Sequence, residues 1–119
     1  MKKCVLCFNL GEEKFSAVSV AGDKNGIEAK QVSQADFSQK LASLLDLLPR
    51  ENALCLSPFK EEMLIMAGLS GDEMDAFLSD LRQASATVAL KAVVTPYNLG
   101  WRCDDLLKEL KKEHAHFGK

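Results

Sequence analysis

The sequence predicts an α/β domain whose four-stranded sheet is covered by about four helices, and two patterns lead to this fold class. Four short apolar runs of strand length alternate with segments whose apolar residues recur at helical spacing. The second half of this order repeats the first, which predicts two β-α-β-α pseudo-repeats with mostly parallel strands inside each unit. The 119 residues fit a single domain, 1–119, made of halves 1–48 and 62–119 and a linker at 49–61. The alternative fold is a ferredoxin-like or ACT-like α+β sandwich.

The first unit begins with a strand and continues with a segment that is compatible with either a helix or a hairpin. The apolar run at residues 4–10 lies between charged residues and a glycine, which predicts a buried strand. Residues 12–24 favour a helix, because their apolar positions have helical spacing and Asn25-Gly26 is a typical helix end. The competing interpretation is a hairpin in which residues 15–21 form a strand and Asn25-Gly26 forms its turn.

The rest of the first unit predicts a strand, a helix and the linker. Residues 27–32 form the expected second strand, and Asp36 is placed to cap the helix that follows. That helix is expected to run up to Pro49 with one apolar stripe, formed by Phe37, Leu41, Leu44, Leu45 and Leu48. Within the linker, residues 53–56 are apolar enough to form a short extra strand.

The second unit repeats this order with clearer helix signals. Residues 62–67 predict the third strand, and Ser70 with Glu73 forms a capping-box sequence at the start of the next helix. The residues that this helix is expected to bury are Met74, Phe77, Leu78 and Leu81. Residues 89–94 predict the fourth strand. The last helix is expected to bury Leu106, Leu107, Leu110 and the face near His114.

The internal repeat rests on matched positions in the two halves. A shift of 62 positions places residues 32–48 on 94–110, and this alignment sets Lys40 on Arg102 and Leu44 on Leu106. The first strands of the two units align at a shift of 59, so the units differ by three residues in between. Because any two β-α segments share an apolar pattern, coincidence is the competing explanation.

Composition and charge exclude several classes of function. The net charge of −2 and the scattered cations do not provide the clustered basic surface that nucleic acids require. Apolar runs stay well short of the roughly 20 residues that span a bilayer, so no membrane association is expected. The apolar run near Met1 is too short for a signal peptide, which predicts a cytoplasmic protein with reduced thiols.

No catalytic or metal-binding constellation is apparent in the sequence. Cys4 and Cys7 have C-x-x-C spacing, but on a strand they point to opposite faces and favour the core. His114 and His116 are two apart on a helix and do not share a face. Because nucleotide-binding fingerprints and nucleophile elbows are also missing, we predict no catalytic residue, metal or cofactor, and an enzyme is the least expected outcome.

The strongest candidate site lies between the fourth strand and the last helix, in a segment that holds the only Trp and the only Tyr. The side chains that we expect to bind a small polar or anionic ligand at a helix N-terminus are those of Lys91, Thr95, Asn98 and Trp101. The same residues also have a purely structural interpretation. Lys91 then faces solvent, Thr95 or Asn98 caps a helix that begins near Asn98 or Trp101, and Trp101 packs in the core.

A family resemblance appears in this segment. The pattern K-A-V-x-T-x-x-N-x-x-W at 91–101, followed by L-L-x-E-L-x-x-E-H at 106–114, resembles a family of small bacterial proteins known only as a domain of unknown function. The resemblance covers residues 62–114, and residues 36–45 are similar to a segment that such proteins carry before a variable linker. It implies a shared fold and a shared local feature, and it implies no activity, cofactor or partner.

Two functional hypotheses follow for this small soluble domain. The first is a non-enzymatic ligand-binding or regulatory module that uses Lys91, Thr95, Asn98 and Trp101. The alternative is a protein–protein interaction or self-associating domain that forms a homodimer, or binds another protein, through a sheet edge or the linker. The linker residues expected to take part are Leu54, Leu56 and Phe59.

Overall fold

The structure is a computed structural model that describes residues 1–117, with side chains through His114. Its elements in chain order are β1 (Cys4–Phe8), α1 (Glu12–Asn25), β2 (Glu28–Gln31), a 3-10 turn (Gln34–Asp36), α2 (Leu41–Leu44), β3 (Met63–Ala67), α3 (Gly71–Gln83), β4 (Leu90–Val93) and α4 (Cys103–Phe117). The segment from 12 to 25 is thus the helix that its spacing favours and not a hairpin. Within residues 1–117, no helix has both the length and the apolar character needed to cross a bilayer.

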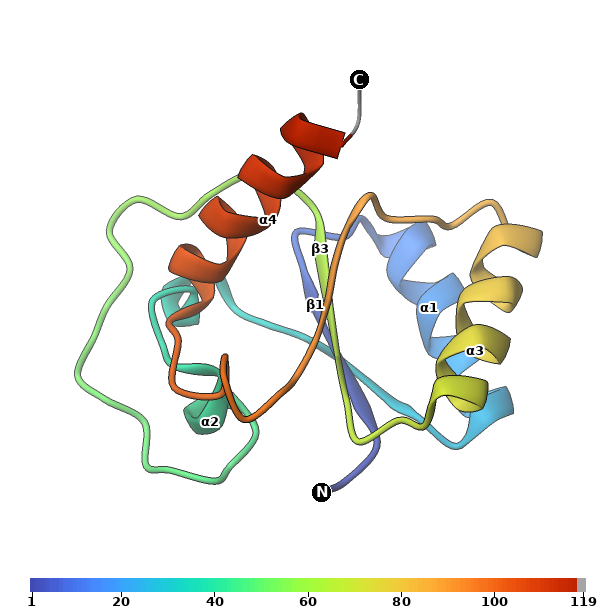
Figure 1. Cartoon of the computed structure of the whole chain (residues 1–119), viewed down its shortest axis with the longest axis horizontal. Helices are drawn as coiled ribbons and strands as arrows, with labels where there is room; N and C mark the ends of the chain where they lie inside the picture. The colour runs from blue at the N-terminus through green and yellow to red at the C-terminus, as the bar shows by residue number, and fades with distance from the viewer. Residues whose placement is uncertain (118–119) are drawn as a thin grey trace.

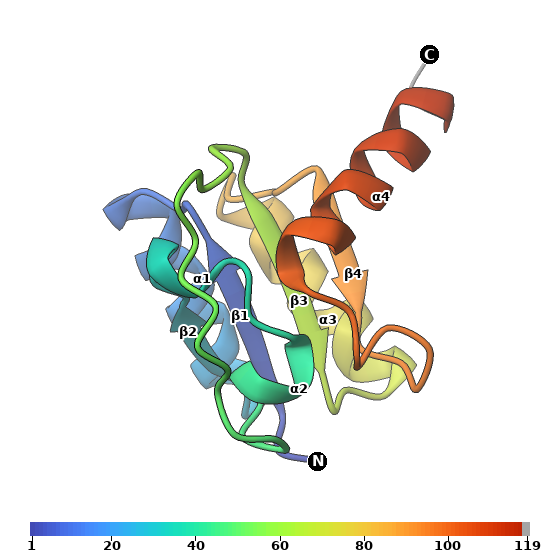
Figure 2. The same cartoon turned by 90° about the vertical axis from the view of Figure 1, so that its left-hand side faces the viewer.

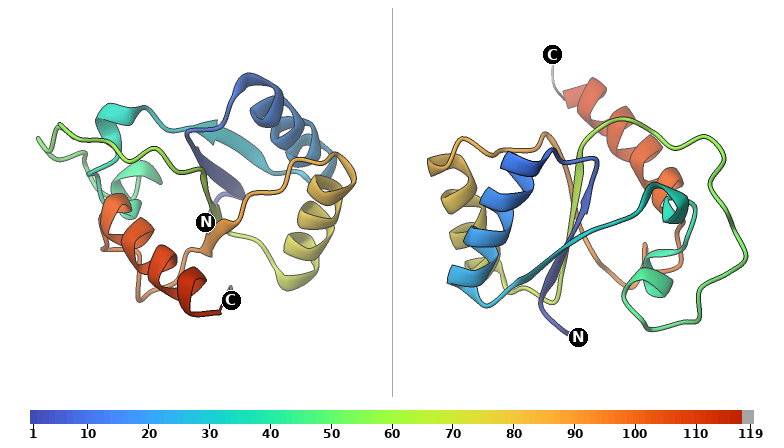
Figure 3. Two further views of the ribbon diagram at one scale, coloured as in Figure 1. Left: turned by 90° about the horizontal axis from the view of Figure 1, so that it is seen from above. Right: turned by 180° about the vertical axis from the view of Figure 1, so that it is seen from behind.

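The four strands form one mixed sheet in the order β2-β1-β3-β4. β1 and β2 are parallel, β3 and β4 are parallel, and the central pair β1–β3 is antiparallel (Figure 2). Helices α1 and α3 lie side by side on one face, while α2 and α4 lie on the other (Figures 1 and 3). The predicted α/β class is therefore confirmed, and the sandwich alternative is wrong because helices cover both faces.

The central strands β1 and β3 are apolar along their whole length because both of their faces are buried. Side chains alternate between the two faces, so Val5 and Cys7 pack beneath α1 and α3 while Leu6 and Phe8 pack beneath α2 and α4. All ten residues of β1 and β3 are buried. This is why the sequence shows continuous apolar runs here and no alternation of polar and apolar residues.

Helices α1 and α3 begin and end with local signals that the sequence contains. At the start of α3 the Ser70 hydroxyl accepts the Glu73 amide, and the Glu73 carboxylate accepts the Ser70 amide, so the capping box is confirmed. An ion pair with Lys3 and the Ser70 amide lower the pKa of Glu73 to about 2. At the end of α1, Gly26 adopts the left-handed conformation at φ 71°. A side chain at Gly22 would meet the Ile27 carbonyl oxygen at 2.5 Å, so glycine permits the close return of the chain into β2.

The predicted helix from Asp36 to Pro49 is wrong. Only the single turn of α2 is helical, and Lys40 before it has extended backbone angles, φ −70° and ψ 150°. The cause lies in another part of the chain: the amides of Leu41 and Ala42 donate to carbonyls of the segment before α4, each at 3.0 Å. This pairing replaces the helical hydrogen bonds, although Phe37, Leu41, Leu44 and Leu45 of the stripe still reach the core. Leu48, the last residue of the stripe, is exposed instead.

The linker 49–61 contains neither helix nor strand, so the extra strand expected at 53–56 is wrong. Buried Gln39 holds the linker near its start, because its Nε2 donates to the Glu51 carbonyl at 2.7 Å and its Oε1 accepts the Glu51 amide at 2.9 Å. The Asn9 amide donates to the carbonyls of Phe59 and Glu61 at the other end. The Phe59 ring stacks on Phe37 with centroids 4.4 Å apart. The linker is therefore an integral part of the core layer beneath α2 and α4.

Several boundaries follow the spacing of the expected repeat. β1 and β3 begin at residues 4 and 63, a shift of 59, while β2 and β4 begin at residues 28 and 90, a shift of 62. Lys40 and Arg102, which the repeat sets at equivalent positions, face each other in an isolated antiparallel bridge. The internal repeat itself stays a prediction.

Candidate functional site

Two of the four predicted site residues, Thr95 and Asn98, come together in the turn that follows β4. The Asn98 side chain accepts the Thr95 amide and donates to the Val93 carbonyl, each at 2.9 Å. The Thr95 hydroxyl accepts the amides of Tyr97 and Asn98 at 3.2 and 3.3 Å. Short polar side chains that bond to nearby backbone in this way stabilise turns. Thr95 and Asn98 thus shape the turn, and they do not cap α4, which begins only at Cys103.

Lys91 is not part of this turn. It lies near the start of β4, and its ammonium donates to the carbonyl of Val88, the residue two positions before the strand, at 2.8 Å. The turn lies beyond the opposite end of the strand. The side chain of Lys91 is largely exposed, as the structural interpretation of an alternating strand expects. The structure therefore separates the predicted cation from the predicted polar groups.

Trp101 is 40% exposed, so the expectation that it packs in the core is wrong. Its carbonyl accepts the Leu41 amide at 3.0 Å, which places the backbone of Trp101 beside α2. The start of α4 lies two residues later than the latest start expected from the sequence, because residues 98–102 are occupied in the turn and in pairing with α2. The indole is consequently displayed at the surface between β4 and α4.

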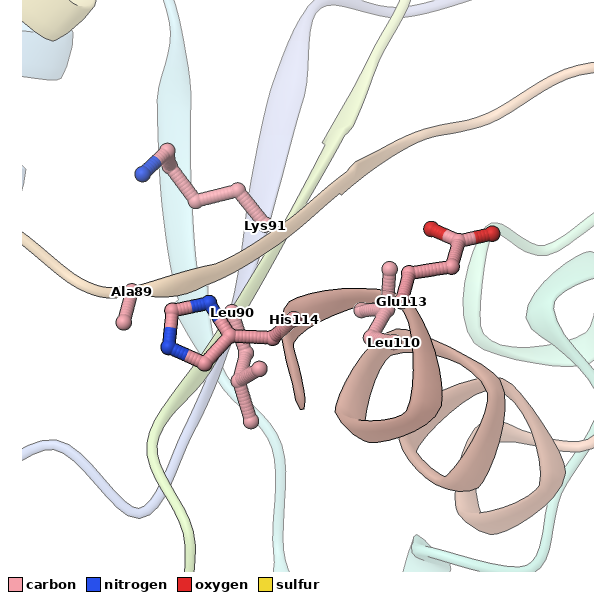
Figure 4. Close-up of a pocket in the computed structure, with 6 residues that line it drawn as sticks. All are labelled: Ala89, Leu90, Lys91, Leu110, Glu113 and His114. Carbon is pink, nitrogen blue, oxygen red and sulfur yellow. The ribbon is translucent and has the colours of Figure 1, made fainter. Parts of the chain in front are cut away.

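A shallow cavity of about 210 Å³ lies between the start of β4 and α4 (Figure 4). The residues that line it are Ala89, Leu90, Lys91, Leu110, Glu113 and His114. Figure 4 shows Lys91 and Glu113 extending in different directions, and His114 is exposed where burial was expected. The cavity therefore holds no paired acid and base. The side chain of His116, the other predicted histidine, lies outside the described residues.

A larger cavity of about 550 Å³ lies at the start of α1. Lys14 and Glu62 both line it, and the Lys14 ammonium pairs with the Glu62 carboxylate at 2.8 Å while also donating to the Thr87 carbonyl at 3.2 Å. Its cation is therefore neutralised by the side chain of the residue just before β3. Such a pair ties α1 to the sheet and leaves no free charge for an anionic ligand.

The three buried cysteines, Cys4, Cys7 and Cys103, are structural. Cys4 and Cys7 are buried on opposite faces of β1, as the spacing predicts. Burial raises the pKa of both Cys7 and Cys103 to about 12, so these thiols are not nucleophiles at neutral pH. Among the described residues, no group of three or more potential ligands could hold a metal ion.

The most conspicuous surface feature is apolar. Six large apolar side chains are exposed on the linker and on the segments that flank α2: Leu47, Leu48, Leu54, Leu56, Tyr97 and Trp101. We call these six residues the apolar surface. The sequence pattern assigns Leu48 to a helix stripe, and it assigns Trp101 either to a ligand site or to the core, so neither residue was expected in an apolar surface. The exposure of Leu54 and Leu56 could have been read from the sequence, because they flank Cys55 in an extended segment where successive side chains point to opposite sides.

Comparison with known proteins shows a similarity to one family and indicates no activity. No curated protein and no solved structure matches the chain. The model of a family described as a domain of unknown function, DUF3783, matches residues 62–117, from the residue before β3 to the end of α4. This confirms the resemblance to a domain-of-unknown-function family that the C-terminal pattern indicated. The similarity to the DUF3783 family covers residues 62–117, which hold β3, α3, β4 and α4.

Proposed function

We propose that this protein is an interaction domain that binds an apolar peptide segment of a partner protein through the apolar surface. The observation that carries the proposal is the exposure of its side chains, which reaches 86% for Leu56 and 90% for Tyr97. Large apolar side chains exposed singly are ordinary, whereas a contiguous apolar patch marks an interaction site, and we infer such a patch from the way these segments adjoin one another. Neither candidate cavity offers a comparable concentration of groups.

Backbone hydrogen bonds support the proximity of the segments that carry this surface. The Ala42 amide donates to the Leu99 carbonyl at 3.0 Å, which sets the 97–101 segment against α2. On the other side, the amides of Leu47 and Leu48 both donate to the Ala42 carbonyl, at 2.8 and 3.2 Å. The two leucines and the aromatic residues thus flank the same helical turn.

The linker extends this surface. The Cys55 amide donates to the Ala35 carbonyl at 3.2 Å, and its side chain packs against the core layer beneath α2 and α4. Because side chains alternate along an extended segment, Leu54 and Leu56 point outward. Phe59, the third linker residue of the interaction hypothesis, is instead stacked in the core.

The aromatic pair is well suited to anchor a partner. Tyr97 lies on a turn whose backbone is fixed by four hydrogen bonds involving the side chains of Thr95 and Asn98. A rigid aromatic residue loses little conformational entropy on binding, and tyrosine and tryptophan are enriched among the residues that dominate binding energy. We therefore expect Tyr97 and Trp101 to contribute most of the affinity.

A displayed library of random peptides tests the proposal even though the partner is unidentified. Selection on the wild-type protein should enrich apolar peptides, and these should bind the Y97A/W101A variant at least tenfold more weakly. The matched control is Val20→Ala, which removes an exposed apolar side chain from α1 on the other face of the sheet and should leave affinity unchanged. Failure to enrich peptides, or peptides that bind the double variant equally well, would refute the proposal.

Binding of a small polar or anionic ligand is the second candidate. Of the four residues predicted for it, Lys91, Thr95, Asn98 and Trp101, it rests on Lys91, which lies apart from the turn. It is favoured by Lys91, which lines both the cavity of about 210 Å³ and a smaller one of about 90 Å³ next to α3. Phosphate and citrate at millimolar concentration should then raise the melting temperature of the wild type and not of Lys91→Ala. Equal shifts in both proteins would exclude Lys91 from binding.

A further inference from the structure

The sheet has two free edges, β2 and β4, and they differ in what they offer a neighbouring strand. A free edge strand presents unpaired backbone groups and is a template for another strand. β2 carries charges of both signs, Glu28 and Lys30, while β4 carries the single charge of Lys91. The charge pattern of an edge decides which strand it accepts.

The backbone of β2 presents a defined set of hydrogen-bonding groups outward. The Glu28 amide donates to the carbonyl of Lys3, the residue just before β1, at 3.1 Å, and the Val32 amide donates to the Cys7 carbonyl of β1 at 2.8 Å. Alternate residues of a strand bond to the same neighbour, so the amide and carbonyl of Ala29 face the free edge. Two copies of β2 placed antiparallel can therefore exchange both backbone hydrogen bonds between their Ala29 residues.

This register brings opposite charges together. With Ala29 opposite Ala29 of a second copy, Glu28 of each copy lies opposite Lys30 of the other, twice across a two-fold axis. Glu28 and Lys30 share one face of β2, and their side chains are 42% and 37% exposed. Directly opposed residues of opposite charge stabilise antiparallel pairs, while like charges destabilise them.

Within one chain, Glu28 and Lys30 have exposed partners: Glu28 pairs with Lys2 and with Lys30. The Glu28 carboxylate lies 2.6 Å from the Lys2 ammonium and 3.8 Å from that of Lys30. Its pKa is lowered chiefly by the hydrogen bond from Lys2. A carboxylate accepts several hydrogen bonds, so Glu28 can keep Lys2 and still face Lys30 of a second copy.

The β4 edge does not offer the same pairing. It has no carboxylate to oppose Lys91 of a second copy. The Val93 carbonyl is already occupied by the Asn98 side chain, so the ladder at that end of β4 is closed. Self-pairing is therefore favoured at β2.

We propose that β2 pairs with β2 of a second copy of this chain, antiparallel about Ala29, to join two sheets into one continuous sheet. The interface is a homodimer of isologous type, in which each copy uses the same residues. The β2 residues that pair, Glu28, Ala29 and Lys30, are not among the six residues of the apolar surface.

Charge exchange between the two positions tests this register directly. The wild type should show an average mass that rises from monomer to dimer with concentration in sedimentation equilibrium. E28K places Lys opposite Lys, and K30E places Glu opposite Glu, so each variant alone should remain monomeric at the concentration where half of the wild type is dimeric. An equimolar mixture of E28K and K30E should form mixed dimers, because each position again faces its opposite charge.

Controls separate this interface from other effects. Thermal unfolding of each single variant shows that it is folded, and a mixture that restores dimers cannot be explained by a change in stability of one chain. K91E on the β4 edge and Y97A/W101A on the apolar surface should dimerise like the wild type. A monomer throughout the concentration range up to 1 mM, dimers unaffected by E28K, or a mixture that stays monomeric would overturn the proposal.

Discussion

Gln39 offers the sharpest test of how the linker is held. Its side chain is only 4% exposed, and it makes two hydrogen bonds to the backbone of Glu51. Gln39→Ala removes both bonds and leaves a partly buried amide and carbonyl without partners. A net hydrogen bond contributes about 1 kcal/mol and an unsatisfied buried group costs about 1–3 kcal/mol, so we expect a loss of about 2–4 kcal/mol. At about 4 °C per kcal/mol for a domain of this size, the melting temperature should fall by roughly 8–16 °C.

Two matched variants isolate the cause of this loss. Gln83→Ala removes the same side-chain type from an exposed position on α3 and should change stability by less than about 0.5 kcal/mol. Glu51→Gln keeps both backbone bonds to Gln39 and removes only the ion pairs with Lys40 and Arg102, at 3.2 and 2.9 Å. Because these pairs are exposed, this variant should lose much less than Gln39→Ala, and its loss should shrink with added salt.

Urea unfolding followed by circular dichroism provides the free energies, and hydrogen exchange at the Glu51 amide reports on the linker itself. Gln39→Ala should speed that exchange under native conditions, whereas Gln83→Ala should not. If Gln39→Ala costs no more than Gln83→Ala, or leaves the exchange unchanged, the linker is not held by this side chain.

Three further results are expected. Gly22→Ala should lower the free energy of unfolding, measured in urea, by about 1–3 kcal/mol because the new methyl group meets the Ile27 carbonyl. Gly71→Ala, which has open space around it, should be neutral or stabilising, and equal effects of the two variants would contradict the packing at Gly22. The pKa of Glu73 is lowered from 4.5 to about 2, so the contribution of its carboxylate to stability is complete above pH 4.5 and is lost as the pH falls toward 2. The difference in unfolding free energy between the wild type and E73Q should therefore shrink between pH 4.5 and pH 2. Cys55 should be the fast-reacting thiol toward an aromatic disulfide reagent in the native protein, since the other three are buried; rapid modification of more than one would refute the burial.

The parts of the fold that were predictable are those decided by neighbouring residues. The capping box of Ser70 and Glu73 acts within one helical turn, and the apolar run of β3 is buried on both faces, so local sequence was sufficient for both. The segment after Asp36 has a helical apolar stripe as clear as any in the chain. Its backbone is nevertheless unwound because Leu41 and Ala42 pair with a segment about 60 residues away, which no local pattern contains.

The candidate site shows the same division. The turn character of Thr95 and Asn98 was readable from their side-chain types, since both bond readily to nearby backbone. The exposure of Trp101 depends on the pairing of its backbone with α2, which the local pattern does not contain. The direction of the Lys91 ammonium depends on the Val88 carbonyl, at the end of β4 opposite the turn. Exposure of Leu54 and Leu56 likewise depends on the hydrogen bond that turns Cys55 inward.

The antiparallel contact at the centre of the sheet has a consequence for the order of folding. Each parallel pair joins strands that are near in sequence; in the pair β1–β2, for example, Cys4 lies opposite Glu28. The antiparallel pair β1–β3 joins strands that the whole linker separates, and there Cys4 lies opposite Ala67. Closing the longer loop has the larger entropic cost, so we expect the β1–β3 pairing at the centre of the sheet to form last. Until then β1 and β3 are apolar strands with open edges, so we expect aggregation of the newly made chain to start from these two segments.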